Sequence, residues 1–333
     1  MALIRHVTQY LPHGIVFFET ASSSLSAFVD SSNDDRPILV ATDGHAHADT
    51  AMIAAAFLAG RGGQNVEVFS AVEGVALPCQ RCQARSGMAR SQGKTSKPCR
   101  TQIALQNALV QRRMAIETQV ALTVGEAAEW PITVRAGTLS DVSRALIAHI
   151  NAQLLVVGQC SHRRLDAPAG SCEATEQLIH SSIPIYIAAP TLRGLARRIV
   201  IAMDFSETSM RAAYLATRFS ARDASLYLVH VLPHAAASEL EERRRHLHRV
   251  AQSVRSGTEC RVESVLLLGA AAPETLGFAD GIQADLIACG ASSLPAYPVA
   301  RPYSPSLGRV ARDLIRRVSC SLLIAPELAV AVK

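Results

Sequence analysis

Two aspartates follow similar apolar runs and are the first candidates for chemistry in this sequence. The run at residues 38–40 leads to Asp43, and the run at 199–201 leads to Asp204. A polar turn and then a helical pattern follow in both places. A strand that ends at an acid and turns directly into a helix opens a βαβ unit. The carboxylate could accept a hydrogen bond from a ribose hydroxyl, help to hold a divalent cation, or only cap the helix.

Further along the chain from each aspartate, two glycines occur, and the two pairs have the same spacing. Gly158 follows Gly137 by 21 positions, and Gly290 follows Gly269 by the same 21 positions. Glycine lets a backbone approach a phosphate, and the free N–H groups at a helix start attract anions. Because ligands of open parallel sheets bind beyond the carboxyl ends of the strands, the aspartates and glycines are expected to line one crevice in each half of the chain.

The elements that must position these residues alternate between strand and helix patterns. In the first half we predict strands at 38–43, 65–72, 131–136, 153–158 and 183–189, with helices at 47–60, 101–123, 139–150 and 171–181. In the second half we predict strands at 198–204, 225–231, 260–268, 285–290 and 320–326, with helices at 207–220, 239–255, 272–282 and 307–317. Strands that are apolar almost throughout indicate a parallel sheet covered on both faces. The pattern predicts a doubly wound α/β fold, made twice.

The spacing also predicts the domain boundaries. Asp43 and Gly137 are 94 positions apart, whereas Asp204 and Gly269 are 65 apart, and the difference of 29 is assigned to an insert at about 73–100. The expected order is a leader and linker (1–36), a first domain (37–190), a linker (191–197), a second domain (198–327) and a tail (328–333).

Composition excludes several classes of protein. The chain has 333 residues, of which 49% are hydrophobic and 18% charged, as in globular proteins. Its longest apolar stretch reaches about ten residues, against roughly 20 for a membrane span, and no secretion signal is evident. We therefore expect a cytoplasmic protein without a membrane partner. Six basic residues and no acid lie between Pro78 and Arg100, so the net charge of +5 belongs to the insert, which disfavours a nucleic-acid partner.

Several stretches resemble the universal stress protein family. They are DFSETS at 204–209, the strand end at 228–231, the spacing of Gly269 and Gly290, and the closing LLIAP at 322–326. The two copies together are similar to the tandem form of the family over roughly residues 37–327. The resemblance implies two flavodoxin-like, Rossmann-like domains, each an open five-stranded parallel sheet in the order 3-2-1-4-5. It also implies pairing through the last strands, either in a homo-oligomer such as a dimer or in a pseudo-dimer within one chain.

Some members of the family bind ATP through a loop of defined spacing. In that loop a glycine is followed by two residues, a second glycine, nine residues, and a glycine with serine or threonine. In the first half a serine replaces the second glycine and eight residues follow it; in the second half a serine replaces it and fourteen residues follow. A serine forced into a left-handed conformation costs about 1–2 kcal/mol.

The resemblance implies one adenine-nucleotide site in each domain. The first would be lined by Asp43, Val72, Gly158, Ser161, Gly170 and Ser171. The second would be lined by Asp204, Val231, Gly290, Ser293, Gly308 and Arg309. The retained Gly-Ser pair at 170–171 favours the first domain, whereas Arg309 could still clamp a phosphate in the second.

The function implied is that of a non-enzymatic stress-response protein that binds or senses ATP, with or without Mg²⁺. One alternative is a module of the same family that binds no nucleotide and acts through an unidentified protein partner. A second is a slow ATPase in which Asp43 or Asp204 holds magnesium. No positioned base, lysine or pair of carboxylates supports efficient turnover, so no catalytic residue is assigned.

Three other patterns are weaker. Cys79, Cys82 and Cys99 begin with zinc-like spacing, but the insert holds no fourth cysteine or histidine, and a mobile basic loop is the preferred interpretation. Residues 87–95 nearly match a phosphate-binding loop but have one residue too many between the glycines. His45, His47 and Asp49 alternate in a turn, which is the pattern of solvated loop residues more than of a metal site; none is predicted.

Overall fold

The computed structural model describes residues 35–74, 100–126, 128–159, 181–234, 237–291 and 307–326, together with the backbone of residues 16–17. The predicted helix at 171–181, the insert with its cysteines and the near match at 87–95 fall almost wholly outside these ranges. Among the helices that are described, none is long and apolar enough to cross a membrane.

The first half, residues 37–190, alternates strands and helices as the apolar pattern predicts. Its elements are β2 (Ile38–Ala41), the short helix η1 (Ala46–Ala48), α2 (Asp49–Gly62), β3 (Val66–Val72), α4 (Arg100–Thr123), β4 (Ile132–Ala136), α5 (Leu139–Ile150), β5 (Leu154–Gly158) and β6 (Ile185–Ala188).

The second half, residues 198–327 with the preceding linker, repeats this order. Its elements are β7 (Ala196–Ala202), α7 (Glu207–Arg218), β8 (Ser220–Leu232), α8 (Ala237–Ser256), β9 (Arg261–Leu268), α9 (Ala271–Gly281), β10 (Leu286–Gly290), α10 (Arg309–Arg317) and β11 (Ser321–Ala325). The short strand β1 (Val16–Phe17) pairs antiparallel with β9.

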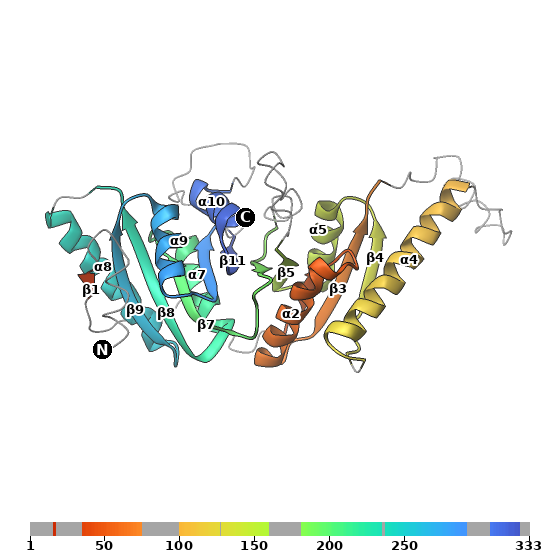
Figure 1. The fold of residues 1–333 in the computed structure, drawn as a ribbon, viewed down its shortest axis with the longest axis horizontal. Helices are drawn as coiled ribbons and strands as arrows, with labels where there is room; N and C mark the ends of the chain where they lie inside the picture. Colours follow the sequence, from red (N-terminus) through yellow and green to blue (C-terminus); the bar gives the residue numbers. More distant parts are fainter. Residues whose placement is uncertain are drawn as a thin grey trace, which may run out of the picture.

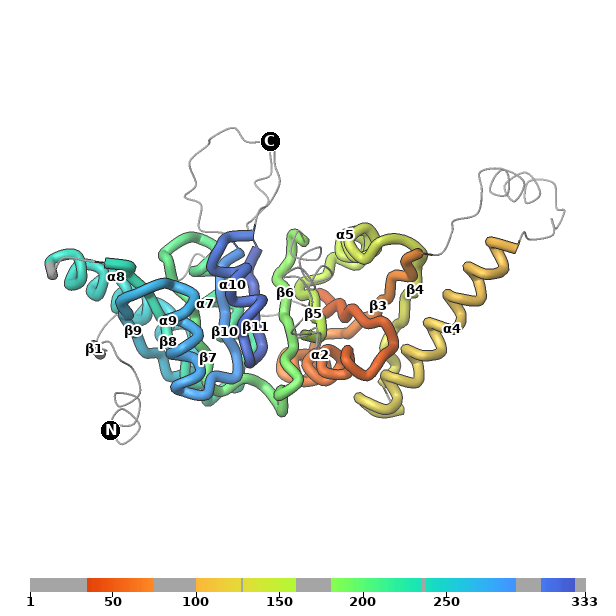
Figure 2. The backbone as a smooth tube through the Cα atoms, turned by 45° about the horizontal axis from the view of Figure 1, so that its top comes forward, coloured from red at the N-terminus to blue at the C-terminus, as the bar shows by residue number. Residues whose placement is uncertain are grey.

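All of these strands join one sheet, in the order β1-β9-β8-β7-β10-β11-β6-β5-β2-β3-β4 (Figure 1). Counted within each half, both parts read 3-2-1-4-5, and all pairings inside them are parallel. The predicted α/β fold class and strand order are therefore confirmed. The last strands of the two halves, β6 and β11, pair antiparallel and join the halves within the single chain (Figure 2).

Most element boundaries lie within three residues of their predictions, and the largest difference is at the start of β8. Strand β8 begins at Ser220, although the sequence predicts a helix up to 220 and a strand from 225. The register between β7 and β8 shifts here, since Ala196 lies opposite Ser220 but Arg198 lies opposite Ser225. The extra residues include the charged pair Arg222 and Asp223, which is why this stretch reads as a turn in the sequence.

The core lies on both faces of the sheet, because neighbouring residues of each central strand point to opposite sides. On one face Ile38 and Ile199 pack in a cluster with residues of α2, α7 and α8. On the other face Leu39 and Val200 pack in a cluster with residues of α5, α9 and α10. The carboxyl ends of the parallel strands are thus held rigidly, and the turns that follow them carry the candidate site.

Candidate functional site

The turn that follows the first strand has the same hydrogen bond in both halves. Asp43 Oδ1 accepts the N–H of His45 at 3.0 Å, and Asp204 Oδ1 accepts the N–H of Ser206 at 3.0 Å. Such a bond, from a side chain to the backbone two residues on, defines an Asx turn. Both aspartates therefore shape their own turn. The capping alternative is wrong, since neither aspartate is the N-cap of the helix that follows: Ser206 caps α7, and α2 has Ala48 at its N-cap.

The residue between these partners is left-handed in both halves. Gly44 has φ +79° and Phe205 has φ +66°. Glycine adopts this conformation freely, whereas a residue with a Cβ loses about 1–2 kcal/mol. The Phe205 ring compensates through contacts: its centroid lies 4.5 Å from the ring of His230 and 4.2 Å from the ring of His246, which is nearly parallel to it.

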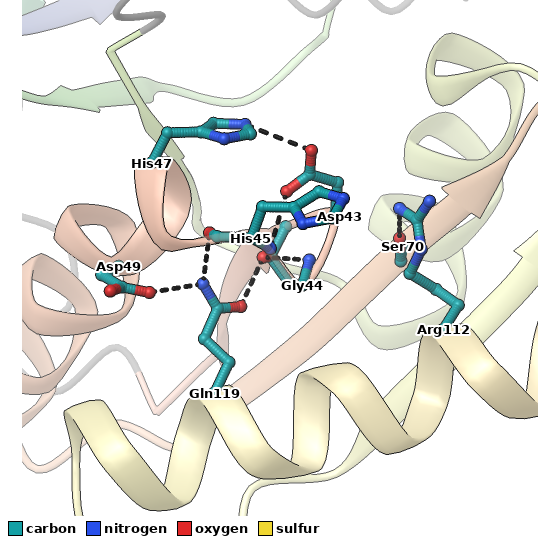
Figure 3. A network of polar contacts seen from close by, with 9 residues as sticks. Asp43, Gly44, His45, His47, Asp49, Ser70, Arg112 and Gln119 are labelled. Atoms are coloured by element: carbon teal, nitrogen blue, oxygen red, sulfur yellow. Dashed lines mark hydrogen bonds and ion pairs between the residues drawn. The ribbon is translucent and has the colours of Figure 1, made fainter.

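In the first half a polar network surrounds the turn (Figure 3). Asp43 Oδ2 lies 3.1 Å from His47 Nε2, so both carboxylate oxygens contact residues of the same turn. Gln119, on α4, donates to the carbonyl of His45 at 2.8 Å and to Asp49 Oδ1 at 2.6 Å. Because Asp49 is directed to Gln119, it does not join the two histidines, and the described residues contain no group of three side chains suited to a metal ion.

The glycines at the ends of β5 and β10 are explained by packing. A Cβ added to Gly290 would lie 2.3 Å from Thr208 Oγ1 and 3.0 Å from the amide nitrogen of Ser209. A Cβ added to Gly158 would lie 3.0 Å from the carbonyl oxygen of His47. In each half the start of the first helix crosses directly over the end of the fourth strand. The recurrence of these glycines is therefore not by itself evidence for a phosphate-binding site.

The structure shows which residues correspond at the ends of β3 and β8, the second strands of the two halves; the sequence alone did not show this. The glycine after β4 donates its N–H to the carbonyl of Val72 at 3.2 Å, and the glycine after β9 donates to that of Leu232 at 2.9 Å. Val72 is therefore the counterpart of Leu232, and Ala71 is the counterpart of Val231.

A cavity of about 90 Å³ lies in the second half, at the carboxyl ends of β7, β8 and β10 and beside the start of α10. Four of the predicted second-half residues line it: Asp204, Val231, Gly290 and Gly308. Arg309 is exposed and is not among the lining residues. The remaining wall is mostly small or apolar: Ala202, Met203, Ser209, Val229, His230, Ala271, Thr275, Cys289, Ala291, Val310 and Ala311.

Only some of the other predicted site residues are among the residues that the structure describes. Asp43, Val72 and Gly158 stand at the ends of the first-half strands or in the turn after β2. Ser161, Gly170, Ser171 and Ser293 lie outside the described residues. The sequence reasoning did not single out His230, although it belongs to the strand end at 228–231 that carries the family resemblance.

The electrostatics of the cavity wall favour neutral side chains apart from Asp204. Burial is the main cause that lowers the pKa of His230, and it outweighs the hydrogen bond to the carbonyl of Met203. Burial also raises the pKa of the Cys289 thiol to about 12, with a smaller effect from the charge of Asp204. Helix α10 begins without a side-chain cap at Gly308, so its first N–H groups add positive potential next to the cavity.

Comparisons with known proteins agree with this architecture. The Universal stress protein family model matches residues 196–326. The structure is similar to a universal stress protein from Archaeoglobus fulgidus DSM 4304, with a TM-score of 0.54 and 16% identity over 88% of this chain and 97% of that one. It is also similar to a functionally unknown protein from Pseudomonas aeruginosa PAO1, with a TM-score of 0.50 and 12% identity over 89% and 94% of the two chains.

No curated protein matches the sequence. At such low identities the structural likeness bears on the fold alone, whereas the family model bears on the sequence of the second half. Residues 196–326, which include every described residue of the cavity wall, therefore match the Universal stress protein family.

Proposed function

We propose that this protein is a non-enzymatic stress-response protein that binds an adenine nucleotide, ATP with or without Mg²⁺, in the second-half crevice. The observation that carries the proposal is the convergence of Asp204, Val231, Gly290 and Gly308 on one cavity. These residues come from four separate elements and were chosen from the sequence. The sequence had favoured the first half, but the described residues gather a cavity in the second.

The size of the cavity limits how the nucleotide would bind. Pockets that enclose a ligand of this size usually measure roughly 300–1,000 Å³, whereas this cavity measures about 90 Å³. Only one part of the nucleotide would enter it, and the rest would lie along the mouth of the crevice. The exposed Arg309 stands at the start of α10, where a guanidinium and helix N–H groups suit a phosphate.

The cavity wall supports binding more than turnover. Asp204 accepts hydrogen bonds from both the N–H and the hydroxyl of Ser206, so its carboxylate is held in the turn. The described wall contains no lysine and no second carboxylate. Phosphoryl transfer needs groups that orient a nucleophile and neutralise charge, and this part of the wall supplies neither.

Asp204→Asn with Asp43→Asn as its matched control tests the position of the site. Asparagine can keep the Asx turn, so each substitution removes charge while preserving the backbone. Loss of one hydrogen bond to a charged group is worth about 1.5–3 kcal/mol, so we expect Asp204→Asn to weaken ATP binding about 10- to 150-fold in equilibrium dialysis. Asp43→Asn should bind as the wild type does. The reverse result would move the site to the first half.

Two further measurements decide among the functions. The purified protein is denatured and its supernatant analysed for ATP and AMP, and phosphate release is followed with added ATP and Mg²⁺. Bound nucleotide with no release is the expected result. Sustained release would favour the ATPase. The absence of bound nucleotide, with no thermal shift on adding ATP and Mg²⁺, would reject nucleotide binding.

A protein-contact function is the second candidate, because α4 exposes apolar side chains. Ile103, Val110 and Met114 are 44%, 57% and 61% exposed, and Leu122 is 82% exposed. Exposed apolar groups gathered on one element are typical of contact surfaces. If this function is correct, Met114→Glu should abolish a self-association seen by analytical ultracentrifugation without changing the melting temperature. A monomeric wild type would count against self-association through α4.

A further inference from the structure

A second pocket lies at the opposite end of the sheet from the second-half cavity. It has a volume of about 600 Å³ and opens where α2, α7 and α8 end and where β8 and β9 begin, at the lower edge of the sheet in Figure 1. Nine residues of β8 separate Arg222, in the wall of this pocket, from Val231, in the wall of the cavity. At about 3.3 Å per residue they span about 30 Å, so the two are separate sites.

The described wall of this pocket is positively charged. It holds three arginines, of which Arg61 comes from α2 in the first half, Arg218 ends α7, and Arg222 lies near the start of β8. Glu259 is the one acid of the described wall, so three positive charges and one negative give +2. Among the residues that the structure describes, neither Arg222 nor Glu259 takes part in an ion pair.

The irregular start of β8 places Arg222 in this pocket. Between two successive pairings with β7, β8 advances five residues while β7 advances two. Such irregularities commonly redirect a side chain. The neighbouring Asp223 forms an ion pair with Arg197 of β7 at 2.5 Å and therefore does not neutralise Arg222. The thiol of Cys260 lies 3.7 Å from the carbonyl oxygen of Arg222 and helps to hold this stretch.

The pocket offers donors more than acceptors. Arg61 Nε donates to the carbonyl oxygen of Ser220 at 3.1 Å, which fixes the guanidinium across the junction of the two halves. The hydroxyls of Thr217 and Ser256 donate to carbonyls of their own helices, at 2.7 and 2.9 Å. The hydroxyl of Thr258 accepts a backbone N–H at 3.2 Å, so its own proton is available to a ligand. Fixed donors and excess positive charge suit an anion.

Stabilisation of the helices does not account for the whole cluster. A cation near the carboxyl end of a helix interacts favourably with the helix dipole. This explains Arg61 and Arg218, which lie in the last turns of α2 and α7. Arg222 lies on a strand and is exposed, so neither a helix dipole nor an ion pair with a described residue explains its position.

We propose that this pocket binds the oxygens of a multiply charged phosphate chain, with Arg61 and Arg222 as the main cationic contacts and the Thr258 hydroxyl as a neutral donor. Guanidinium groups match phosphate oxygens in charge and geometry. The volume lies within the roughly 300–1,000 Å³ that is usual for ligand sites. Because Arg61 and Arg222 come from different halves, the site exists only where the halves are joined. The proposal does not depend on the nucleotide crevice.

The test is isothermal titration calorimetry with inorganic tripolyphosphate at pH 7.5 and physiological ionic strength. Arg222→Gln should bind about 5- to 50-fold more weakly than wild type, between the effects of an exposed ion pair and of a hydrogen bond to a charged group. Glu259→Gln removes the acid of the described wall and should bind about 1.5- to 5-fold more tightly.

Arg245→Gln is the matched control, because it also removes one exposed positive charge. It lies eleven residues before the end of α8, about 16 Å along the helix and beyond the distance over which salt screens charges. It should bind as the wild type does. Equal weakening by Arg245→Gln and Arg222→Gln would show general attraction to a basic surface and overturn the site.

The remaining outcomes separate the sources of the phosphate chain. ATP is titrated into Asp204→Asn, in which the nucleotide crevice is weakened. Binding that then falls with Arg222→Gln assigns the phosphate chain of a nucleotide to the pocket, whereas binding of tripolyphosphate alone assigns a free polyphosphate. If neither binds, the proposal is rejected, and the crevice keeps its own test. Should Arg222→Gln melt much earlier than wild type, Arg222→Lys must restore part of the binding; otherwise the role of Arg222 is rejected.

Discussion

Gly290→Ala is the sharpest test of how the crevice is packed. The new Cβ would lie 2.3 Å from Thr208 Oγ1 and 2.8 Å from Thr208 Cβ. Thr208 is only 7% exposed, and its Oγ1 lies 3.0 Å from Ser206 Oγ, so its side chain has little room to turn away. The start of α7 would have to move from the end of β10.

The expected cost follows from overpacking. Inserting a methyl group into a closely packed contact typically destabilises by about 1–3 kcal/mol. At about 2–4 °C per kcal/mol, the melting temperature should fall by about 2–12 °C. Thr208→Ala removes the atom in the closest contact, so the double variant should lose less stability than the sum of the two single variants.

Gly158→Ala is the matched control in the first half. Its Cβ would meet the carbonyl oxygen of His47 at 3.0 Å and the Cα of Ala48 at 3.3 Å, contacts that a shift of a few tenths of an ångström relieves. Differential scanning calorimetry of the nucleotide-free protein should therefore give Gly290→Ala a melting temperature well below that of Gly158→Ala. If Gly290→Ala has the melting temperature of the wild type but no longer binds ATP, the glycine is required for ligand binding and the packing argument is refuted.

Three more predictions concern single side chains. Gly44→Ala should lower stability by about 1–2 kcal/mol in urea unfolding, because φ is +79° and its Cβ would approach α4 at 3.0 Å; unchanged stability would show that the turn relaxes. Burial lowers the folded-state pKa of His230 below the ordinary histidine value of about 6.5, so the unfolded chain binds the proton first and stability should decrease as the pH falls below about 6.5. His230→Asn should flatten that dependence between pH 7.5 and 5.5, and an identical slope would contradict its assignment to His230. Cys289 and Cys320, whose pKa values burial raises to about 12, should resist iodoacetamide at pH 8 in the native protein and react in guanidinium, as peptide mass spectrometry would show; rapid native labelling would contradict their burial.

The fold was predictable because its signals are local. Short apolar strands, capping residues such as Ser206 and repeated glycine spacing all act within one element or one turn. The family resemblance added the strand order, which periodicity alone does not reveal. The boundary of β8 was missed because Arg222 and Asp223 have the local pattern of a turn, whereas pairing with β7 extends the strand through them.

The candidate site was predictable only in part. The sequence identified Asp204, Val231, Gly290 and Gly308, since strand ends and helix starts can be located from local patterns. It did not identify the pocket of Arg61 and Arg222, because these side chains come from different halves and line one pocket only in the folded chain.

By itself the sequence determined two rounds of strand and helix, with an acid after each first strand and a glycine at the end of each fourth. The tertiary structure decided which of these residues meet in a cavity. It also decided that Gly290 accommodates Thr208 and that the Phe205 ring contacts two histidines. The physical reason is distance along the chain: periodicity and turn chemistry are written in neighbouring residues, whereas a cavity and its unpaired groups depend on side chains brought together from separate elements.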